Sequence, residues 1–276
     1  MKEAFFDERG IYYRASDIKD DRPTLLFVHG LSGSSSVWLP YERHFESSYN
    51  IVSPDLRGHG KSRKQFFYGA YEPELIADDV VALLKHLSIS RAVIIGHSFG
   101  TFIAVSILKL APERFSAAIF LSPTYGASHA WWLPLARIVA SIFGFLSIFL
   151  PFDPRGRGHV NYEKYAPTGD WSLSRIIPDI KNTSARVYIF CMRHIYKLDT
   201  DEWWREVKIP SLIIHGKKDT IIPFEKAERL HALWPHSQLI LMDNANHILP
   251  VNDVPEVIAV LSSFLARIFV RDRVRP

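Results

Sequence analysis

Short apolar runs alternate with segments of helical periodicity along the first 123 residues, and the alternation returns after residue 209. Residues 24–30 (TLLFVHG) form an apolar run that ends in glycine, as a buried strand does. Residues 73–87 begin with proline and repeat apolar side chains at helical spacing. Strands are predicted at 11–15 (as an edge strand), 24–30, 50–60 (running into a glycine-rich loop), 91–98, 117–123, 210–219 and 238–247, and helices at 35–48, 73–87, 99–110, 224–234 and 253–269. Such alternation predicts an α/β fold with a mostly parallel central sheet and helices on both faces.

The alternation stops between residues 124 and 208. This stretch is rich in aromatic residues and prolines and shows no strand–helix repeat. We therefore expect a core made of residues 1–123 and 209–276, interrupted by a mainly helical cap at 124–208.

The most apolar part of the predicted cap is residues 131–152 (WWLPLARIVASIFGFLSIFLPF), which is about as long as a membrane span. Small and polar residues interrupt it and form one stripe at helical spacing. They are Arg137, Ser141, Gly144 and Ser147. The pattern predicts a helix that is apolar over most of its circumference. A packed lid helix is favoured over a helix at a membrane interface, and a transmembrane span is the least favoured.

The composition is that of a soluble globular protein, because 47% of the residues are hydrophobic, 22% are charged and the mean hydropathy is +0.00. The net charge of +4 comes largely from arginines in the final stretch RIFVRDRVRP, which favours a solvated tail over a nucleic-acid site. The only cysteine, Cys191, cannot form an internal disulfide and sits in an apolar run typical of a packing residue. With no apolar leader in MKEAFFDERG, we expect a cytoplasmic protein. The oligomeric state stays open.

Polar residues and glycines follow several of the predicted strands. Because the carboxyl ends of parallel strands meet at one edge of a sheet, these residues are expected to converge there. They are His29-Gly30, Asp55, His97-Ser98, Asp219 and His247.

Ser98 is the candidate nucleophile. It lies in Gly96-His97-Ser98-Phe99-Gly100, a Gly-x-Ser-x-Gly pattern between a predicted strand and a predicted helix. A serine hydroxyl needs a base to take its proton, and the base needs an acid to hold it. On such a scaffold the chain order is serine, acid, histidine, and Asp219 and His247 satisfy this order. No acid follows the strand at 117–123, so the main competing place for the acid is empty.

The chain resembles α/β-hydrolase-fold serine esterases and lipases with a cap, of the carboxylesterase and monoacylglycerol-lipase kind. The resemblance covers the core and includes FVHGLSGSS at 27–35, PDLRGHGKS at 54–62, GHSFG at 96–100, IIHGKKDTIIP at 213–223 and NANHI at 244–248. It implies that Ser98 is the nucleophile, Asp219 the acid and His247 the base, and that the N–H groups of Leu31 and Phe99 form the oxyanion hole. His29 and His59 are expected to pin loops, and His97 to shape the turn. Asn246 departs from the family, in which glycine is frequent at that place.

The expected substrate is a small-molecule carboxylic ester, hydrolysed through an acyl-enzyme. Aromatic residues of the predicted cap, taken as Trp131, Trp132, Phe143 and Phe145, favour a lipophilic acyl pocket, although such residues also form the internal core of a cap. The same triad could serve lactones, C–C bonds or perhydrolysis, and a non-enzymatic ligand-binding member of the fold is a further alternative. No metal, nucleotide cofactor, nucleic-acid partner or membrane span is expected, and transient contact with an interface through the cap stays open.

Overall fold

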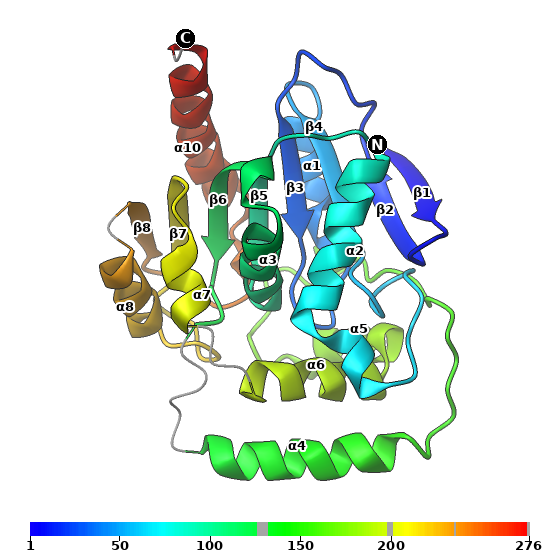
Figure 1. Cartoon of the computed structure of the whole chain (residues 1–276). Helices are drawn as coiled ribbons and strands as arrows, with labels where there is room; N and C mark the ends of the chain where they lie inside the picture. The colour runs from blue at the N-terminus through cyan, green and yellow to red at the C-terminus, as the bar shows by residue number, and fades with distance from the viewer. Residues whose placement is uncertain (126–131, 198–200, 235, 275–276) are drawn as a thin grey trace.

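An eight-stranded sheet organises the protein, whose computed structural model describes residues 1–125, 132–197, 201–234 and 236–274 (Figure 1). The strand order is β1-β2-β4-β3-β5-β6-β7-β8. The strands are β1 (Lys2–Phe6), β2 (Ile11–Ala15), β3 (Thr24–Val28), β4 (Asn50–Pro54), β5 (Ala92–His97), β6 (Phe115–Leu121), β7 (Ser211–Gly216) and β8 (Ser237–Met242). Pairing is parallel from β4 through β8, and only β1 and β2 run antiparallel to their neighbours.

Helices cover both faces of this sheet, as the alternation predicts. On β3, Leu26 and Val28 belong to a core that also contains side chains of α2 and α3, whereas Leu25 and Phe27 belong to a second core with α1 and α10. This period of two is what a strand buried on both faces requires. The helices of the core are α1 (Leu39–Phe45), α2 (Pro73–His86), α3 (Phe99–Leu110), α8 (Glu225–Leu233), α9 (Leu249–Asn252) and α10 (Val254–Val274). The predicted fold class is confirmed.

The edge of the sheet differs from the prediction. Residues 11–15 form β2, but β2 is an inner strand because the preceding β1 pairs with it in a hairpin. Gly10 turns the chain between them with a positive φ of 69°. The sequence of β1 is short and charged, so it does not by itself predict a strand. Pairing with β2 is what stabilises β1 as a strand.

The segment between β6 and β7 contains helices but no strand among its described residues. Its helices are α4 (Leu133–Ser147), α5 (Leu173–Thr183), α6 (Ala185–Lys197) and α7 (Asp201–Glu206). The last of them packs on the core, since the buried Trp204 of α7 contacts the rings of Phe120 and Trp234. On α6, Cys191 is fully buried, and burial raises the pKa of its thiol. This burial agrees with the packing role predicted for Cys191.

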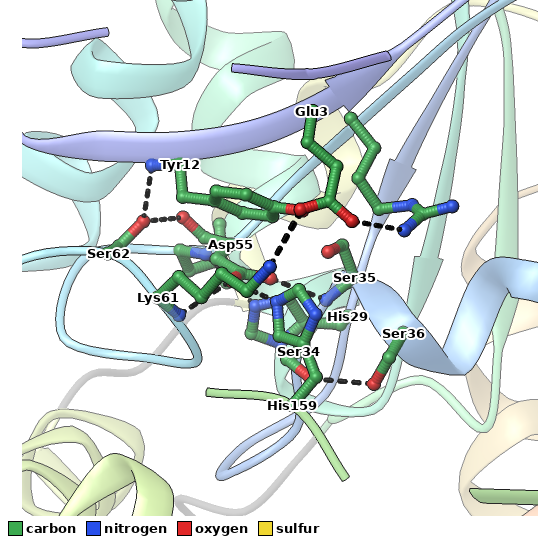
Figure 2. Close-up of polar contacts among 12 residues, drawn as sticks. Glu3, Tyr12, His29, Ser34, Ser35, Ser36, Asp55, Lys61, Ser62 and His159 are labelled. Atoms are coloured by element: carbon green, nitrogen blue, oxygen red, sulfur yellow. Dashed lines mark hydrogen bonds and ion pairs between the residues drawn. The ribbon is translucent and has the colours of Figure 1, made fainter. Parts of the chain in front are cut away.

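A buried carboxylate ties the β6–β7 segment to the loop after β4 (Figure 2). Asp55 accepts hydrogen bonds from the backbone N–H groups of Ser35 and Lys61, at 2.7 and 2.8 Å, and from Nε2 of His159 at 2.7 Å. Burial opposes ionisation of Asp55, but the contact with His159 and these N–H donors outweigh it, so the pKa of Asp55 is lowered. His159 thereby fixes the middle part of the β6–β7 segment onto the core.

The apolar helix of this segment, α4, turns its apolar side toward solvent, whereas a buried lid helix would turn that side toward the protein. Its small and polar stripe lies against α6: Gly144 and Ser147 approach Arg193 and Arg186. Apart from the buried Leu133, most of its large apolar side chains are exposed. The expectation of a packed lid helix is therefore corrected: α4 packs through its small residues and not through its apolar side. Figure 1 shows α4 lying beyond α6 from the sheet. Within the described ranges, no helix combines the length and apolar character needed to cross a bilayer.

Candidate active site

Ser98 lies at a strained turn between β5 and α3. Its backbone has φ 50° and ψ −120°, a conformation that costs a non-glycine residue about 1–3 kcal/mol. The flanking glycines permit the turn. A Cβ atom on Gly96 would lie 2.8 Å from the carbonyl oxygen of Gly100, and one on Gly100 would lie 2.4 Å from that of Val28. Two glycines therefore surround the serine so that β5, α3 and the end of β3 can meet closely.

Ser98, His247 and Asp219 form a continuous hydrogen-bonded relay. Nδ1 of His247 lies 2.7 Å from Oδ2 of Asp219, and Nε2 lies 2.8 Å from Oγ of Ser98. A carboxylate can only accept, so Nδ1 carries the proton and Nε2 of the neutral ring accepts from the serine hydroxyl. His247 and Asp219 are buried, whereas Ser98 is partly exposed. The structure brings together the three side chains predicted from the sequence.

The surroundings of Asp219 keep it ionised. Burial opposes its charge, but hydrogen bonds with His215 and His247 and with the backbone N–H group of Ile222 outweigh that cost. The pKa of Asp219 consequently lies well below its usual range. Its second oxygen, Oδ1, accepts from the N–H groups of Ile221 and Ile222 at 2.9 and 2.7 Å. The carboxylate is thus fixed in charge and in orientation toward His247.

Two other histidines hold the loops around Ser98. His29 lies 2.8 Å from the carbonyl oxygen of Gly30 through Nδ1 and accepts from the N–H group of Leu56 through Nε2. Nε2 of His97 lies 2.9 Å from the carbonyl oxygen of His247. Burial, assisted by nearby His247, lowers the pKa of His97 to about 3, so its ring stays neutral. His29 has the loop-pinning contacts expected of it, whereas His97, which was expected to shape the turn, contacts the loop of His247.

The predicted oxyanion donors follow the two strands that meet at the turn. Phe99 is the first residue of α3, directly after Ser98, and Leu31 comes just after β3. The close approach of Gly100 to the carbonyl groups of Val28 and His29 shows that the start of α3 packs against the end of β3. The N-terminus of a helix favours a developing negative charge.

Asp170, a residue that the sequence analysis did not single out, contacts the loops that carry Asp219 and His247. Its Oδ1 accepts from the N–H group of His247 at 2.9 Å. Its Oδ2 accepts from the N–H group and the hydroxyl of Thr220, next to Asp219, at 2.8 and 2.7 Å. Asp170 belongs to the aperiodic β6–β7 segment, where no spacing relates it to Asp219 or His247.

Asn246 adds further hydrogen bonds between the loop of His247 and the β6–β7 segment. Its Nδ2 donates to the carbonyl oxygen of Thr168 at 2.9 Å, and its Oδ1 accepts from the N–H group of Ile248 at 3.0 Å. Asn252 also donates to the carbonyl oxygen of Thr168, at 2.8 Å. A glycine at position 246 could make neither side-chain bond. Asn246 therefore holds the loop of His247 against residues 168–170.

Three of the four aromatic residues predicted to line an acyl pocket are exposed on the surface of the molecule. Trp132, Phe143 and Phe145 are all more than 40% exposed. Phe145 lines an open hollow of about 310 Å³ between α4, α6 and residues 66–68. Trp131 lies outside the described residues. This exposure does not favour an acyl pocket, because α4 turns its small residues toward the protein instead.

Among the described residues, no group of three or more histidine, cysteine or carboxylate side chains is arranged so that it could hold a metal ion. The relay of Ser98, His247 and Asp219 is instead suited to nucleophilic catalysis. The base can accept the serine proton while the acid stabilises the resulting imidazolium.

Comparison with known proteins finds enzymes that are similar to this chain. A putative esterase/lipase of Haemophilus influenzae is 25% identical over 251 residues, covering 88% of this chain and 83% of the relative. 3-Oxoadipate enol-lactonase 2 of Acinetobacter baylyi is 26% identical over 241 residues, covering 83% of each chain. A thermophilic esterase from Thermogutta terrifontis shares the fold, with a TM-score of 0.71 at 19% identity over 94% of this chain and 93% of the other. Residues 23–253, which include the whole relay, match the family described as the alpha/beta hydrolase fold, and the chain belongs to that family of hydrolases.

Proposed function

We propose that the protein hydrolyses carboxylic esters through an acyl-enzyme on Ser98, with residues 124–208 acting as a cap on the core. The observation that supports this most directly is the relay of Ser98, His247 and Asp219, with both hydrogen bonds shorter than 3 Å. The relative named as a putative esterase/lipase supports the choice of an ester.

In this mechanism Oγ of Ser98 attacks the ester carbonyl while Nε2 of His247 takes its proton. The N–H groups of Leu31 and Phe99 stabilise the oxyanion, and such donors together contribute several kcal/mol in the transition state. His247 then protonates the departing alkoxide, and the alcohol leaves. A water molecule, deprotonated by His247, attacks the acyl-enzyme, and the proton returns to Ser98 as the acid is released.

A lactone is the second candidate substrate. The enol-lactonase of Acinetobacter baylyi is as similar to this chain as the putative esterase is. The same steps apply to a lactone, but the leaving alkoxide stays attached to the acyl group. A single hydroxy acid is then the product in place of an acid and an alcohol.

The proposal is tested with p-nitrophenyl esters from acetate to palmitate, alongside lactones of matched carbon number. We expect turnover of the esters, with a maximum at one of the longer acyl chains if the acyl site is lipophilic. Chromatography of the products separates the two candidates, because only lactone opening yields a single product. Activity on lactones with none on open-chain esters would replace the proposed substrate class, and no turnover of either class would contradict the proposal.

Asp170→Ala is expected to lower kcat by about 10- to 100-fold with a smaller change in KM, because misplaced catalytic groups slow the chemical step. The variant loses three hydrogen bonds, one to the loop of His247 and two to Thr220. Asp170→Asn retains one acceptor oxygen and is expected to recover part of kcat. Steady-state kinetics with one ester substrate measures both effects.

Asp179→Ala is the matched control for Asp170. Asp179 is also a buried carboxylate of the β6–β7 segment, but it binds Tyr162 and Arg175, and neither of these is part of the relay. We expect this variant to lower the melting temperature with kcat largely preserved. Equal losses of kcat in the two variants would assign Asp170 a general structural role only.

A further inference from the structure

The outward face of α4 and the turn after it form an exposed apolar surface. We call this surface the α4 face, and its side chains are Leu135, Ile138, Val139, Ile142, Phe143, Phe145, Leu146, Ile148, Phe149 and Leu150. Phe149 is 72% exposed, and Phe67 in the neighbouring loop is 74% exposed. Phe67 also lines the hollow beside Phe145 and Ile148, which makes the apolar surface continuous across the two segments. Surfaces of this kind mark interaction sites in folded proteins.

Polar contacts fix α4 in this orientation. Arg186 of α6 donates to the carbonyl oxygens of Ser147 and Leu150, so it caps the end of α4. Arg137 of α4 donates in turn to the carbonyl oxygen of Tyr196, at the end of α6. A Cβ atom on Gly144 would lie 2.8 Å from the Arg193 guanidinium, so the helices touch where the side chain is smallest. A rotation of α4 that buried its apolar side chains would break these contacts. The packing of α4 on α6 therefore keeps the apolar side chains exposed.

The charged side chains of α4 and α6 themselves have a single sign. Helices α4 and α6 contain no aspartate or glutamate, and they carry Arg137, Arg186, Arg193 and Lys197. Three of these four cations, Arg137, Arg193 and Lys197, line one cleft with Tyr68 and Ser141 at the edge of α4. An apolar face with cations at its edge complements the acyl chains and anionic headgroups of a lipid bilayer. Two copies of the same face would bring cations together, which disfavours self-association.

We propose that the α4 face docks the protein on the surface of a bilayer with anionic headgroups. The apolar side chains enter the boundary between headgroups and acyl chains, while Arg137, Arg193 and Lys197 contact the phosphates. The helix lies in the plane of the interface, consistent with its 15 residues. Docking requires no turnover, so its test is independent of the proposed esterase activity.

Flotation of the full chain with lipid vesicles tests the proposal. We expect the wild type to float with vesicles of equimolar phosphatidylcholine and phosphatidylglycerol, and less with phosphatidylcholine alone. Ile142→Ser is expected to weaken partitioning by about tenfold, because apolar side-chain burial drives such binding. Lys197→Gln is expected to weaken binding to the anionic vesicles by about fivefold and to leave binding to phosphatidylcholine unchanged.

Leu110→Ser is the matched control. Leu110 is 51% exposed and Ile142 is 53% exposed. Leu110, however, is the last residue of α3, one of the helices that cover the central sheet, and does not belong to the α4 face. This variant is expected to float like the wild type, and circular dichroism checks that both variants are folded. Failure of the wild type to float with anionic vesicles overturns the proposal, as does equal partitioning of Ile142→Ser and the wild type. A dimer in gel filtration that Ile142→Ser dissociates, without flotation, would identify a second copy as the occupant.

Discussion

Ser98→Ala is expected to lower kcat for ester hydrolysis by at least about 10⁴-fold, because the substitution removes the atom that forms the acyl-enzyme. The backbone of the turn should persist, since alanine differs from serine only by the hydroxyl. A phosphonate ester that reacts covalently with activated serines is expected to add its mass to the wild type and not to the variant. Steady-state kinetics and intact-protein mass spectrometry measure the two effects.

Ser106→Ala provides the control for this substitution. Ser106 lies on α3, the helix that follows Ser98, and its buried hydroxyl has no hydrogen-bond partner among the described residues. We expect this variant to keep wild-type kcat and to be labelled by the phosphonate. Retention of activity in Ser98→Ala, or labelling at a different residue, would remove Ser98 from the mechanism.

Asp219→Asn is expected to lower kcat at neutral pH by about 10⁴-fold, close to the effect of replacing the acid of such a triad. An asparagine can turn an N–H group toward Nδ1 of His247, which favours the tautomer with the proton on Nε2. In that tautomer Nε2 cannot accept the proton of Ser98. The measurement is kcat with an ester substrate, and labelling by the phosphonate is expected to slow in parallel.

The control for the acid is Asp243→Asn. Asp243 lies between β8 and His247, but its carboxylate is exposed and pairs with Lys217. The same change of charge close to the site is therefore expected to leave kcat within about twofold, since exposed ion pairs contribute little. If Asp219→Asn retained activity like that of Asp243→Asn, the acid would have to be another carboxylate.

The core and the relay could be predicted from the sequence because local patterns determine them. The apolar run before Gly96 predicts β5, and the periodicity after Ser98 predicts α3. Parallel strands then carry Ser98, Asp219 and His247 to the same edge of the sheet. The hydrogen bonds of the relay join residues up to 149 positions apart, yet each residue lies in a motif that can be recognised by itself.

Two features could not be predicted, for different physical reasons. Asp170 is one carboxylate in an aperiodic segment, and its contact with His247 follows only from the packing of the whole chain. The stripe of Ser141, Gly144 and Ser147 was visible in the sequence, but periodicity gives the two faces of a helix and not which of them is buried. The guanidinium groups of α6 decide the orientation, through contacts that no local pattern in α4 encodes.

The contacts of Asp170 also bear on how such a protein can be altered. A segment that only covered a site, and made no contact needed to position its residues, could be exchanged between relatives without changing the rest of the chain. Here the β6–β7 segment supplies an acceptor to the backbone of His247 and to Thr220, so the rest of the chain does not by itself complete the contacts of the loops that carry Asp219 and His247. The β6–β7 segment and the two loops thus depend on one another structurally, and a chimera that replaces the segment has to restore that acceptor.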